Sequence, residues 1–270
     1  MVETEWARLK AHELRALAAE GAAVILPVAS IEQHGPHLPV MTDTRLGLEI
    51  ARRAALKAWE TRKTVVAPVV WSGLSEHHMP FGGTLTLRQS TFLAVLADLV
   101  DAMARHGFRQ VLISNSHGGN IIAMQAAADE IGARGEVTVV AATYVQEAAG
   151  AFAKILEDQS GVQHACEAET AMMLAVEPGL VDASDLAALG TDPNAPYLRA
   201  GAAAHRWRSF ASVTGDGVLG RPAKATAEKG ERLVEAGAEA IAALLTDPAV
   251  WAEAEDRRGA GTAGVAFRDR

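Results

Sequence analysis

Short apolar runs alternate with amphipathic segments along most of the chain, and this alternation constrains the fold more than any other feature. Four runs are short, continuous and rich in β-branched residues, as buried strands are. They cover residues 22–28, 64–70, 110–114 and 136–144. Five segments repeat apolar residues at helical spacing. They cover residues 44–59, 89–106, 121–131, 167–176 and 222–245. This pattern predicts a three-layer α/β fold, a mostly parallel sheet with helices on both faces.

The chain length suits one domain with a continuous core, since 270 residues contain no repeat, low-complexity block or dividing linker. We therefore expect a single domain over residues 1–270. Residues 180–202 are expected to form a loop, because Gly and Pro interrupt them. The tail after about residue 248 is expected to be loosely attached.

Charge and composition exclude several classes of partner. The net charge is −8, and an acidic protein gains no long-range attraction to a polyanion, so nucleic acid is not an expected partner. The longest apolar stretch, about residues 21–31, is too short to span a bilayer. Cys166 is the single cysteine, and acids stand at the N-terminus where a secretory signal carries bases. These features predict a cytoplasmic protein.

Side chains that bind metals follow two of the predicted strands. Glu32 and His34 come after the first strand and point to the same side of an extended chain. Asp43 follows a loop with Gly and Pro, and His117 follows the third strand. Because ligands bind at the carboxyl ends of parallel strands, these four side chains are expected to converge. Two carboxylates and two imidazoles suit Zn²⁺, Mn²⁺ or Fe²⁺.

Each of these residues also has a structural interpretation. Asp43 could cap the helix that follows it. His117, which precedes two glycines, could be an ordinary loop histidine, and Glu32 could be a solvated charge. The position of all the candidates at one sheet edge favours a metal site over these separate explanations.

The motifs resemble those of the creatininase (creatinine amidohydrolase) family. Residues 26–43 read LPVASIEQHGPHLPVMTD, and the similarity continues through 75–84 and 115–120. It resumes at 164–170 and 217–230, so it covers nearly the whole chain. The resemblance implies a creatininase-like α/β hydrolase that acts on carbon–nitrogen bonds and forms a closed homo-oligomer, often a hexamer.

The resemblance also implies two divalent ions that lie close together. Glu32 and His117 would hold one ion, His34 would hold the other, and Asp43 would bridge them. Creatininase itself has Tyr-Glu after the His that matches His117, and that Glu binds the second ion. This chain has two glycines there, 118 and 119. We hypothesise that Glu169 completes the second ion.

Four further residues receive roles around these ions. The resemblance implies that His164 is an acid–base group that protonates the leaving nitrogen, although a histidine at the start of a helix could be structural. His37 is expected to orient a metal ligand. Ser75 and Asn120 are expected to contact substrate.

The expected activity is hydrolysis of an amide-type C–N bond in a small molecule: a cyclic amide, a formamide or a small peptide. A divalent ion makes this feasible at neutral pH, because it lowers the pKa of bound water from about 15.7 to roughly 7. Creatininase carries a Trp-Asp pair ahead of the His that matches His164, whereas residues 158–163 contain none. We therefore expect poor or no creatinine turnover. The HGGN form of 117–120 looks more like other branches, which include a formamide deformylase and a peptidase acting on a small modified peptide.

Three alternatives have weaker support. A serine hydrolase would need a Gly-x-Ser-x-Gly nucleophile elbow, which the sequence does not contain. Residues 215–220 read GDGVLG, as a dinucleotide-binding loop can, but Pro222 follows and no later strand completes the unit. The non-enzymatic alternative is a metal-free binding or scaffold protein on the same fold, with degenerate ligands.

Overall fold

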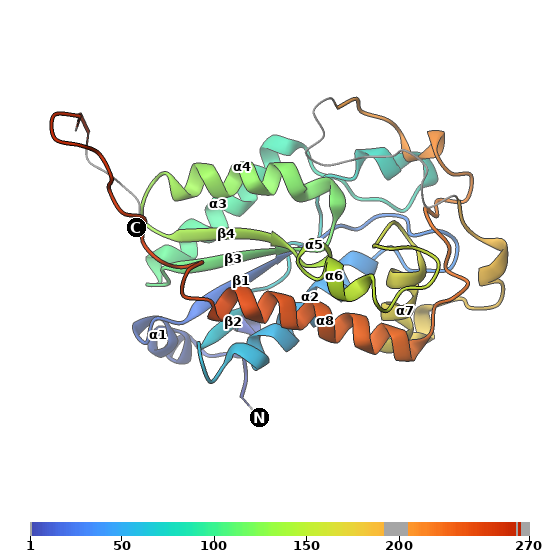
Figure 1. Ribbon diagram of the computed structural model, residues 1–270, viewed down its shortest axis with the longest axis horizontal. Coiled ribbons are helices and arrows are strands. Elements are labelled where there is room, and N and C mark those ends of the chain that lie inside the picture. Colours follow the sequence, from blue (N-terminus) through green and yellow to red (C-terminus); the bar gives the residue numbers. More distant parts are fainter. Residues whose placement is uncertain (1, 192–204, 263, 266–270) are drawn as a thin grey trace.

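The computed structural model describes residues 2–191, 205–262, 264 and 265 (Figure 1). Four of its strands form one parallel sheet in the order β2-β1-β3-β4. The strands are β1 (Ala23–Val28), β2 (Thr64–Val66), β3 (Gln110–Asn115) and β4 (Thr138–Thr143). The expected α/β architecture with a parallel sheet is confirmed.

Helices cover both faces of this sheet (Figure 1). The long helices are α2 (Thr42–Ala58), α3 (Gln89–Arg105), α4 (Ile121–Gly132), α7 (Glu167–Val176) and α8 (Ala227–Thr246). The shorter ones are α1 (Ala11–Ala19), α5 (Tyr144–Glu147) and α6 (Ala149–Phe152). Short 3₁₀ segments are η1 (Trp6–Arg8), η2 (Glu76–Phe81), η3 (Gly118–Asn120), η4 (Pro178–Leu180), η5 (Leu186–Ala188) and η6 (Phe210–Ser212).

Alternate residues of β1 enter two separate cores, because strand side chains alternate between the faces of a sheet. Ala23 and Ile25 pack with α2, α7 and α8 on one face. Val24 and Leu26 pack with α3 and α4 on the other face. A strand buried on both faces must be apolar at every position, which explains the continuous apolar run in the sequence.

The order of the strands creates a crevice at their carboxyl ends. The connection that leaves β1 leads through α2 to β2, on one side of β1. The connection that leaves β3 leads through α4 to β4, on the opposite side of β3. Neighbouring strands whose connections diverge leave space between them, and this is where open α/β sheets bind ligands.

Several boundaries differ from those expected. β2 ends at Val66 rather than at residue 70, because Pro68 has no N–H to donate to a neighbouring strand. α8 begins at Ala227 rather than at residue 222, because Thr226 Oγ1 caps it by accepting from Lys229 N. α1 was not expected. It has no buried residue and therefore gives a weak amphipathic signal.

The expected loop and tail are only partly described. The loop over 180–202 is described to Thr191, which forms a bridge with Gly220, and residues 192–202 lie outside the described residues. Beyond residue 248, Trp251 is buried and its Nε1–H donates to Leu244 O at 2.8 Å. Residues 252–262 are exposed, and residues 263 and 266–270 also lie outside the described ones.

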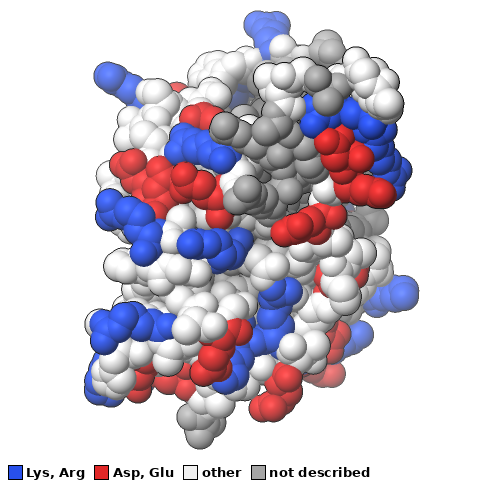
Figure 2. All heavy atoms as spheres, turned by 90° about the vertical axis from the view of Figure 1, so that its left-hand side faces the viewer, with Lys and Arg blue, Asp and Glu red and all other residues white. Residues whose placement is uncertain are grey.

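Figure 2 shows the face at the left of Figure 1, where acidic and basic side chains lie interleaved. This face therefore does not present the continuous basic surface that attracts a polyanion. Within the described ranges, no helix is both long and apolar enough to cross a membrane.

Candidate metal centre

Four candidate ligands lie at the carboxyl ends of β1 and β3, where the two connections diverge. Glu32 and His34 follow β1, and His117 follows β3. Asp43 stands in the first turn of α2, which starts where the connection from β1 returns to the sheet. The exposed fractions of these side chains run from 0% for His34 to 4% for His117. The structure therefore brings together the four residues that follow these strands in the sequence.

Asp43 faces two histidines with its two carboxylate oxygens. Its Oδ1 lies 3.3 Å from Nε2 of His34, and its Oδ2 lies 3.3 Å from Nδ1 of His117. Nδ1 of His117 also lies 3.1 Å from Oε2 of Glu32. One carboxylate is therefore shared between two groups of donors, which is the arrangement of a bridging ligand between two ions.

These donors fit a divalent cation. Nε2 of His34 and Oδ2 of Asp43 are buried and have no hydrogen-bond partner among the described residues. Leaving buried polar atoms without partners is costly, and a metal ion would satisfy both. The alternative that Asp43 caps α2 is wrong, because the N-cap residue is Met41 and no side chain caps this helix.

Charge within the cluster shifts the pKa values of both histidines upward. Burial lowers the pKa of His34, but the charge of Asp43 outweighs it and raises that pKa to about 10. Burial also opposes the charged form of His117, yet Glu32 holds its pKa well above the usual value. Protons on these imidazoles balance the buried carboxylates, and a divalent cation could supply the same positive charge.

Glu169 joins the cluster from α7. Its Oε2 lies 3.9 Å from Nε2 of His34 and accepts a hydrogen bond from Ala165 N at 2.5 Å. Ala165 adopts φ +52°, a left-handed conformation that is uncommon for residues other than glycine. Burial, followed by the charge of Asp43, raises the pKa of Glu169 to about 7 against the opposing effect of His34. Glu169, His34 and Asp43 form one of the groups whose ligand atoms lie close enough to hold an ion.

His164 lies on the other side of Glu32. Its Nε2 donates to Gln33 O at 2.7 Å, because a carbonyl oxygen can only accept. Its Nδ1 lies 3.4 Å from Oε1 of Glu32. Burial, with the nearby charge of His34, lowers the pKa of His164 to about 3, so the ring is neutral and Nδ1 faces the cluster with its lone pair.

Two further residues take part, namely Gln33, which was not expected from the sequence, and His78, which was expected either to line the cleft or to pack. The Gln33 amide donates to Nδ1 of His78 at 2.8 Å and to Gly217 O at 3.1 Å. The proton of His78 therefore stands on Nε2, which lies 3.3 Å from Oε1 of Glu32. Only the position of Gln33 between two candidate ligands could have indicated this role, since its partners are far away in the sequence.

Ser75 and Asn120 contact protein groups rather than open space. Oγ of Ser75 donates to Oε2 of Glu32 at 2.6 Å. The Asn120 amide donates to Ala29 O at 3.0 Å, and its oxygen accepts from Leu74 N at 2.9 Å. Both side chains are fully buried. Ser75 therefore orients the candidate ligand Glu32. Asn120 joins the loop after β1 to the loop that carries Ser75.

His37 lies beside α7. Its Nε2 is 2.8 Å from Oγ1 of Thr170, the residue after Glu169. It therefore contacts the helix that carries a candidate ligand and not the ligand itself.

Gly119 is the second of the two glycines that follow His117. A Cβ atom added there would lie 2.3 Å from Leu74 O and 2.4 Å from Nε2 of His117. No side chain fits at this position without movement of the backbone. Residue 119 therefore cannot supply a ligand side chain to the cluster.

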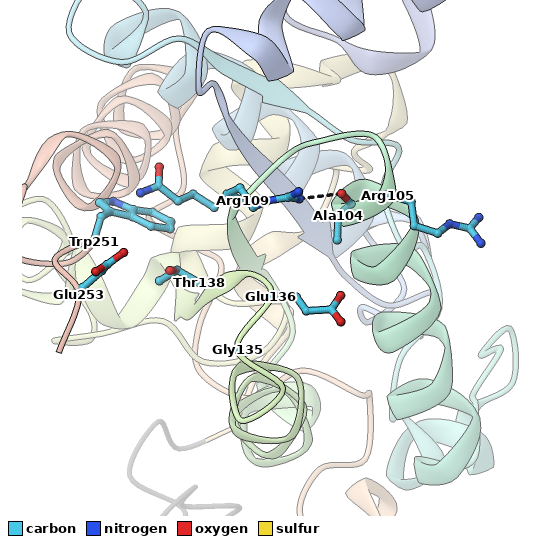
Figure 3. A pocket seen from close by; sticks show the side chains of 9 residues that line it. Ala104, Arg105, Arg109, Gly135, Glu136, Thr138, Trp251 and Glu253 are labelled. Atoms are coloured by element: carbon cyan, nitrogen blue, oxygen red, sulfur yellow. Dashed lines mark hydrogen bonds between the residues drawn. The ribbon is translucent and has the colours of Figure 1, made fainter. Parts of the chain in front are cut away.

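A separate hollow of about 540 Å³ lies at the opposite end of the sheet. Figure 3 shows Arg105, Arg109, Glu136 and Trp251 around it, where β3 and β4 begin. The Arg109 guanidinium donates to Ala104 O at 2.7 Å at the edge of this hollow. None of the candidate ligands lines this hollow.

Comparison with known proteins agrees with the motifs. Residues 7–245 match the Creatininase family model, described as creatinine amidohydrolase. A mycofactocin precursor peptide peptidase from Mycolicibacterium smegmatis is 34% identical over 215 residues, 78% of each chain. A 3-dehydro-scyllo-inosose hydrolase from Thermotoga maritima is 27% identical over 247 residues, which are 83% of this chain and 76% of the relative.

Solved structures show the same fold. A crystal structure of creatinine amidohydrolase (creatininase) superposes with a TM-score of 0.76 at 24% identity, covering 90% of this chain and 96% of that one. The match to the family model spans most of the chain and confirms the resemblance seen in the motifs. The chain belongs to the creatininase family.

Proposed function

We propose that this protein is a metal-dependent hydrolase that cleaves an amide-type C–N bond. The observation that carries the proposal is the position of Asp43, whose two oxygens face His34 and His117 in a buried cluster. Membership of a family of hydrolases supports it. In a scaffold protein with degenerate ligands, burial of Nε2 of His34 and Oδ2 of Asp43 without a hydrogen bond would cost free energy and serve no function.

The proposed centre holds two divalent ions, Zn²⁺, Mn²⁺ or Fe²⁺. Glu32 and His117 hold one, His34 and Glu169 hold the other, and Asp43 bridges them. The distance of 3.9 Å between Glu169 Oε2 and His34 Nε2 supports the assignment of Glu169. Nitrogen and carboxylate donors suit these borderline cations better than they suit a metal that prefers thiolates.

When bound, such ions polarise the substrate carbonyl and allow water to act as a nucleophile near neutral pH. His164 then accepts a proton from the attacking water on its unprotonated Nδ1, which faces the cluster, and passes that proton to the leaving nitrogen. Gln33 fixes the ring of His164 through its carbonyl oxygen. Ser75 orients Glu32 and Asn120 joins the loops, and the expectation that both also contact substrate stays a prediction.

The proposed substrate is a short peptide rather than creatinine. A relative named as a precursor peptide peptidase is 34% identical to this chain. Residues 118 and 119 are glycines instead of the Tyr-Glu pair of creatininase, and the segment 158–163 lacks its Trp-Asp pair. We further propose that the protein is cytoplasmic and forms a homo-oligomer such as a hexamer. Light scattering after gel filtration would measure the number of chains in the oligomer.

The test compares protein stripped with a chelator and protein reloaded with Zn²⁺, Mn²⁺ or Fe²⁺. Each form is assayed against short peptides, a formamide and creatinine, and its metal content is measured by mass spectrometry. We expect hydrolysis of at least one peptide by the reloaded protein and little creatinine turnover. Asp43→Asn should lose bound metal and activity together, whereas Asp98→Asn on the exposed face of α3 should change neither.

Three outcomes would contradict the proposal. Full activity after complete removal of metal would exclude a metal-dependent reaction. Bound metal without hydrolysis of any amide would favour a binding protein. Efficient creatinine hydrolysis would leave the hydrolase proposal intact and overturn the proposed substrate.

A further inference from the structure

His77 is a buried histidine that lies beside the candidate centre. It belongs to η2, on the connection that follows β2, and its side chain is 8% exposed. One ligand atom of His77 lies within 4.8 Å of ligand atoms of both Glu32 and His117. A zinc ion holds nitrogen and carboxylate ligands at about 2.0–2.2 Å, which places them about 3–4 Å from one another. Small rotations of the three side chains would therefore bring these atoms onto one ion.

The ring of His77 lies against the backbone of Gly119. A Cβ atom added to Gly119 would lie 3.1 Å from Cε1 of His77 and 2.4 Å from Nε2 of His117. Cε1 is the ring carbon between the two nitrogens, so the edge of the His77 ring that carries both possible donors faces this position. The rings of His77 and His117 are nearly parallel, at 9°, and their centroids lie 5.8 Å apart. The glycine after His117 therefore leaves room for a second imidazole beside the first.

The segment that carries His77 is also hydrogen-bonded to the loop that carries His117. Leu74 N donates to Oδ1 of Asn120 at 2.9 Å. Leu74 O accepts from Nε2 of His117 at 3.2 Å, because a carbonyl oxygen can only accept. This bond leaves Nδ1 of His117, which lies 3.1 Å from Oε2 of Glu32, as the nitrogen that can bind an ion. Leu74 stands three residues before His77, so one short segment orients His117 and places His77 beside it.

We propose that His77 is a metal ligand, the second imidazole on the ion that Glu32 and His117 hold. The inference rests on the proposed function, because it assumes the centre of two ions. With Asp43 as the bridge, this ion has four protein ligands, whereas the ion at His34 has three. The ion with more protein ligands binds more tightly. The other ion keeps more room for water and for a substrate carbonyl, as catalytic sites do.

Titration of the metal-free protein with Co²⁺ tests this inference without any assay of hydrolysis, since Co²⁺ accepts nitrogen and carboxylate donors. Competition with a chelating dye gives the affinity of each binding step, and the visible absorption of bound Co²⁺ reports its ligands. Loss of a residue that only orients a ligand costs about 10–100-fold in affinity, so loss of a direct ligand in His77→Ala should weaken the tighter step by at least about 100-fold. The absorption that accompanies this step should change as well. His12→Ala, at an exposed position of α1, should alter neither.

Chemical rescue separates a ligand from a residue that only fills space. His77→Gly removes the imidazole, and free imidazole added to this variant should recover most of the lost Co²⁺ affinity. Pyrrole has a ring of the same size but no nitrogen lone pair to donate, and it should recover none. The wild type is titrated in the same solutions to correct for Co²⁺ that free imidazole binds. His77→Gln keeps a polar side chain without an imidazole, so it should show the same loss and replaces His77→Ala if that variant does not fold.

Two results would overturn this inference alone. Equal Co²⁺ affinity and absorption in His77→Ala and the wild type would show that His77 does not bind the ion, and the proposed hydrolase would still stand on its other ligands. Recovery by pyrrole as well as by imidazole would show that the ring of His77 only packs. Failure of the wild type to bind any divalent ion would instead overturn the proposed function and this inference together.

Discussion

At the scale of single residues, Glu32 is held by neighbours on both of its oxygens. Ser75 Oγ donates to Oε2, and the imidazoles of His78 and His164 face Oε1. Burial raises the pKa of Glu32, but the charge of His117 and its hydrogen bond to Glu32 outweigh burial and leave that pKa well below the usual value. Glu32 is therefore an oriented anion before any ion binds, which lowers the cost of forming the centre.

Replacement of Ser75 by alanine should weaken metal binding without abolishing it. The variant removes the 2.6 Å hydrogen bond that orients Glu32, and loss of such a bond commonly costs about 10–100-fold in metal affinity. Competition with a chelating dye measures the affinity. Ser90→Ala, at an exposed position of α3, is the control and should bind metal like the wild type. Equal affinities in both variants would mean that Ser75 does not orient the ligand.

Replacement of Glu169 by alanine should reduce the metal content from about two ions per chain to about one. Glu169 is the candidate from α7 that approaches His34, and a side chain at Gly119 cannot replace it. Elemental analysis of the purified variant measures the stoichiometry, with Glu228→Ala on the exposed face of α8 as the control. An unchanged metal content would remove Glu169 from the ligands.

Metal binding should release protons and strengthen as the pH rises. The pKa of His34 is raised from 6.5 to about 10 in the ion-free protein, so this ring carries a proton at pH 7.5. An incoming ion must displace that proton, and affinity therefore falls as the pH is lowered. Calorimetry at pH 7.5 in two buffers with different ionisation enthalpies counts the protons released. Identical heats in both buffers would contradict the protonated state of His34.

At the scale of elements, the position of Glu169 depends on how α7 packs against α8. A Cβ atom added to Gly230 of α8 would lie 1.8 Å from Ala171 O of α7. The two helices therefore approach more closely than any residue with a side chain would allow. Lys229, next along α8, pairs at 2.7 Å with the buried carboxylate of Glu167 at the start of α7.

The variant Gly230→Ala should lower the free energy of unfolding by about 3 kcal/mol, because the added methyl group forces the helices apart. Urea denaturation measures the change. Gly150→Ala is the control, since no atom lies within 4 Å of a Cβ atom added there and its effect should stay below about 1 kcal/mol. Equal stability of Gly230→Ala and the wild type would show that the backbone adjusts freely.

The elements that sequence patterns predict well are those whose burial depends on local residues. β1 is apolar throughout and β3 has an apolar centre at residues 111–113, and both lie close to their expected positions. The start of α8 was misplaced because its cap is a single hydrogen bond to Thr226, which competes with the helical pattern of the preceding residues. α1 was missed because helices without buried residues give little periodicity.

At the scale of the whole molecule, the candidate centre is predictable where its residues follow neighbouring strands. Glu32, His34 and His117 could be brought together because parallel strands end at one edge. The contacts of Gln33 with His78 and Gly217 could not, since these join distant segments through loops with no periodic pattern. The contact between the rings of Phe210 and His78, whose centroids lie 4.4 Å apart, was missed for the same reason.

Removal of the ions should lower the thermal stability of the whole molecule. Ions that bind only the folded state stabilise it by about 2.7 kcal/mol when their free concentration is 100 times the Kd. For a chain of this length, that corresponds to roughly 5–10 °C in Tm. Differential scanning calorimetry with and without added Zn²⁺ or Mn²⁺ measures the shift, and Asp43→Asn should show almost none. An equal shift in this variant would indicate binding elsewhere.

The candidate ligands belong to two mechanically distinct bodies. Glu32, His34 and His117 are attached to the ends of adjacent strands, whereas Glu169 is carried by a helix whose place is set by Gly230 and α8. A small slide of that helix would alter one half of the centre and leave the other half undisturbed. Substitutions where α7 packs against α8 could therefore change the affinity for one ion, without any change at the strand ends that hold the other ion.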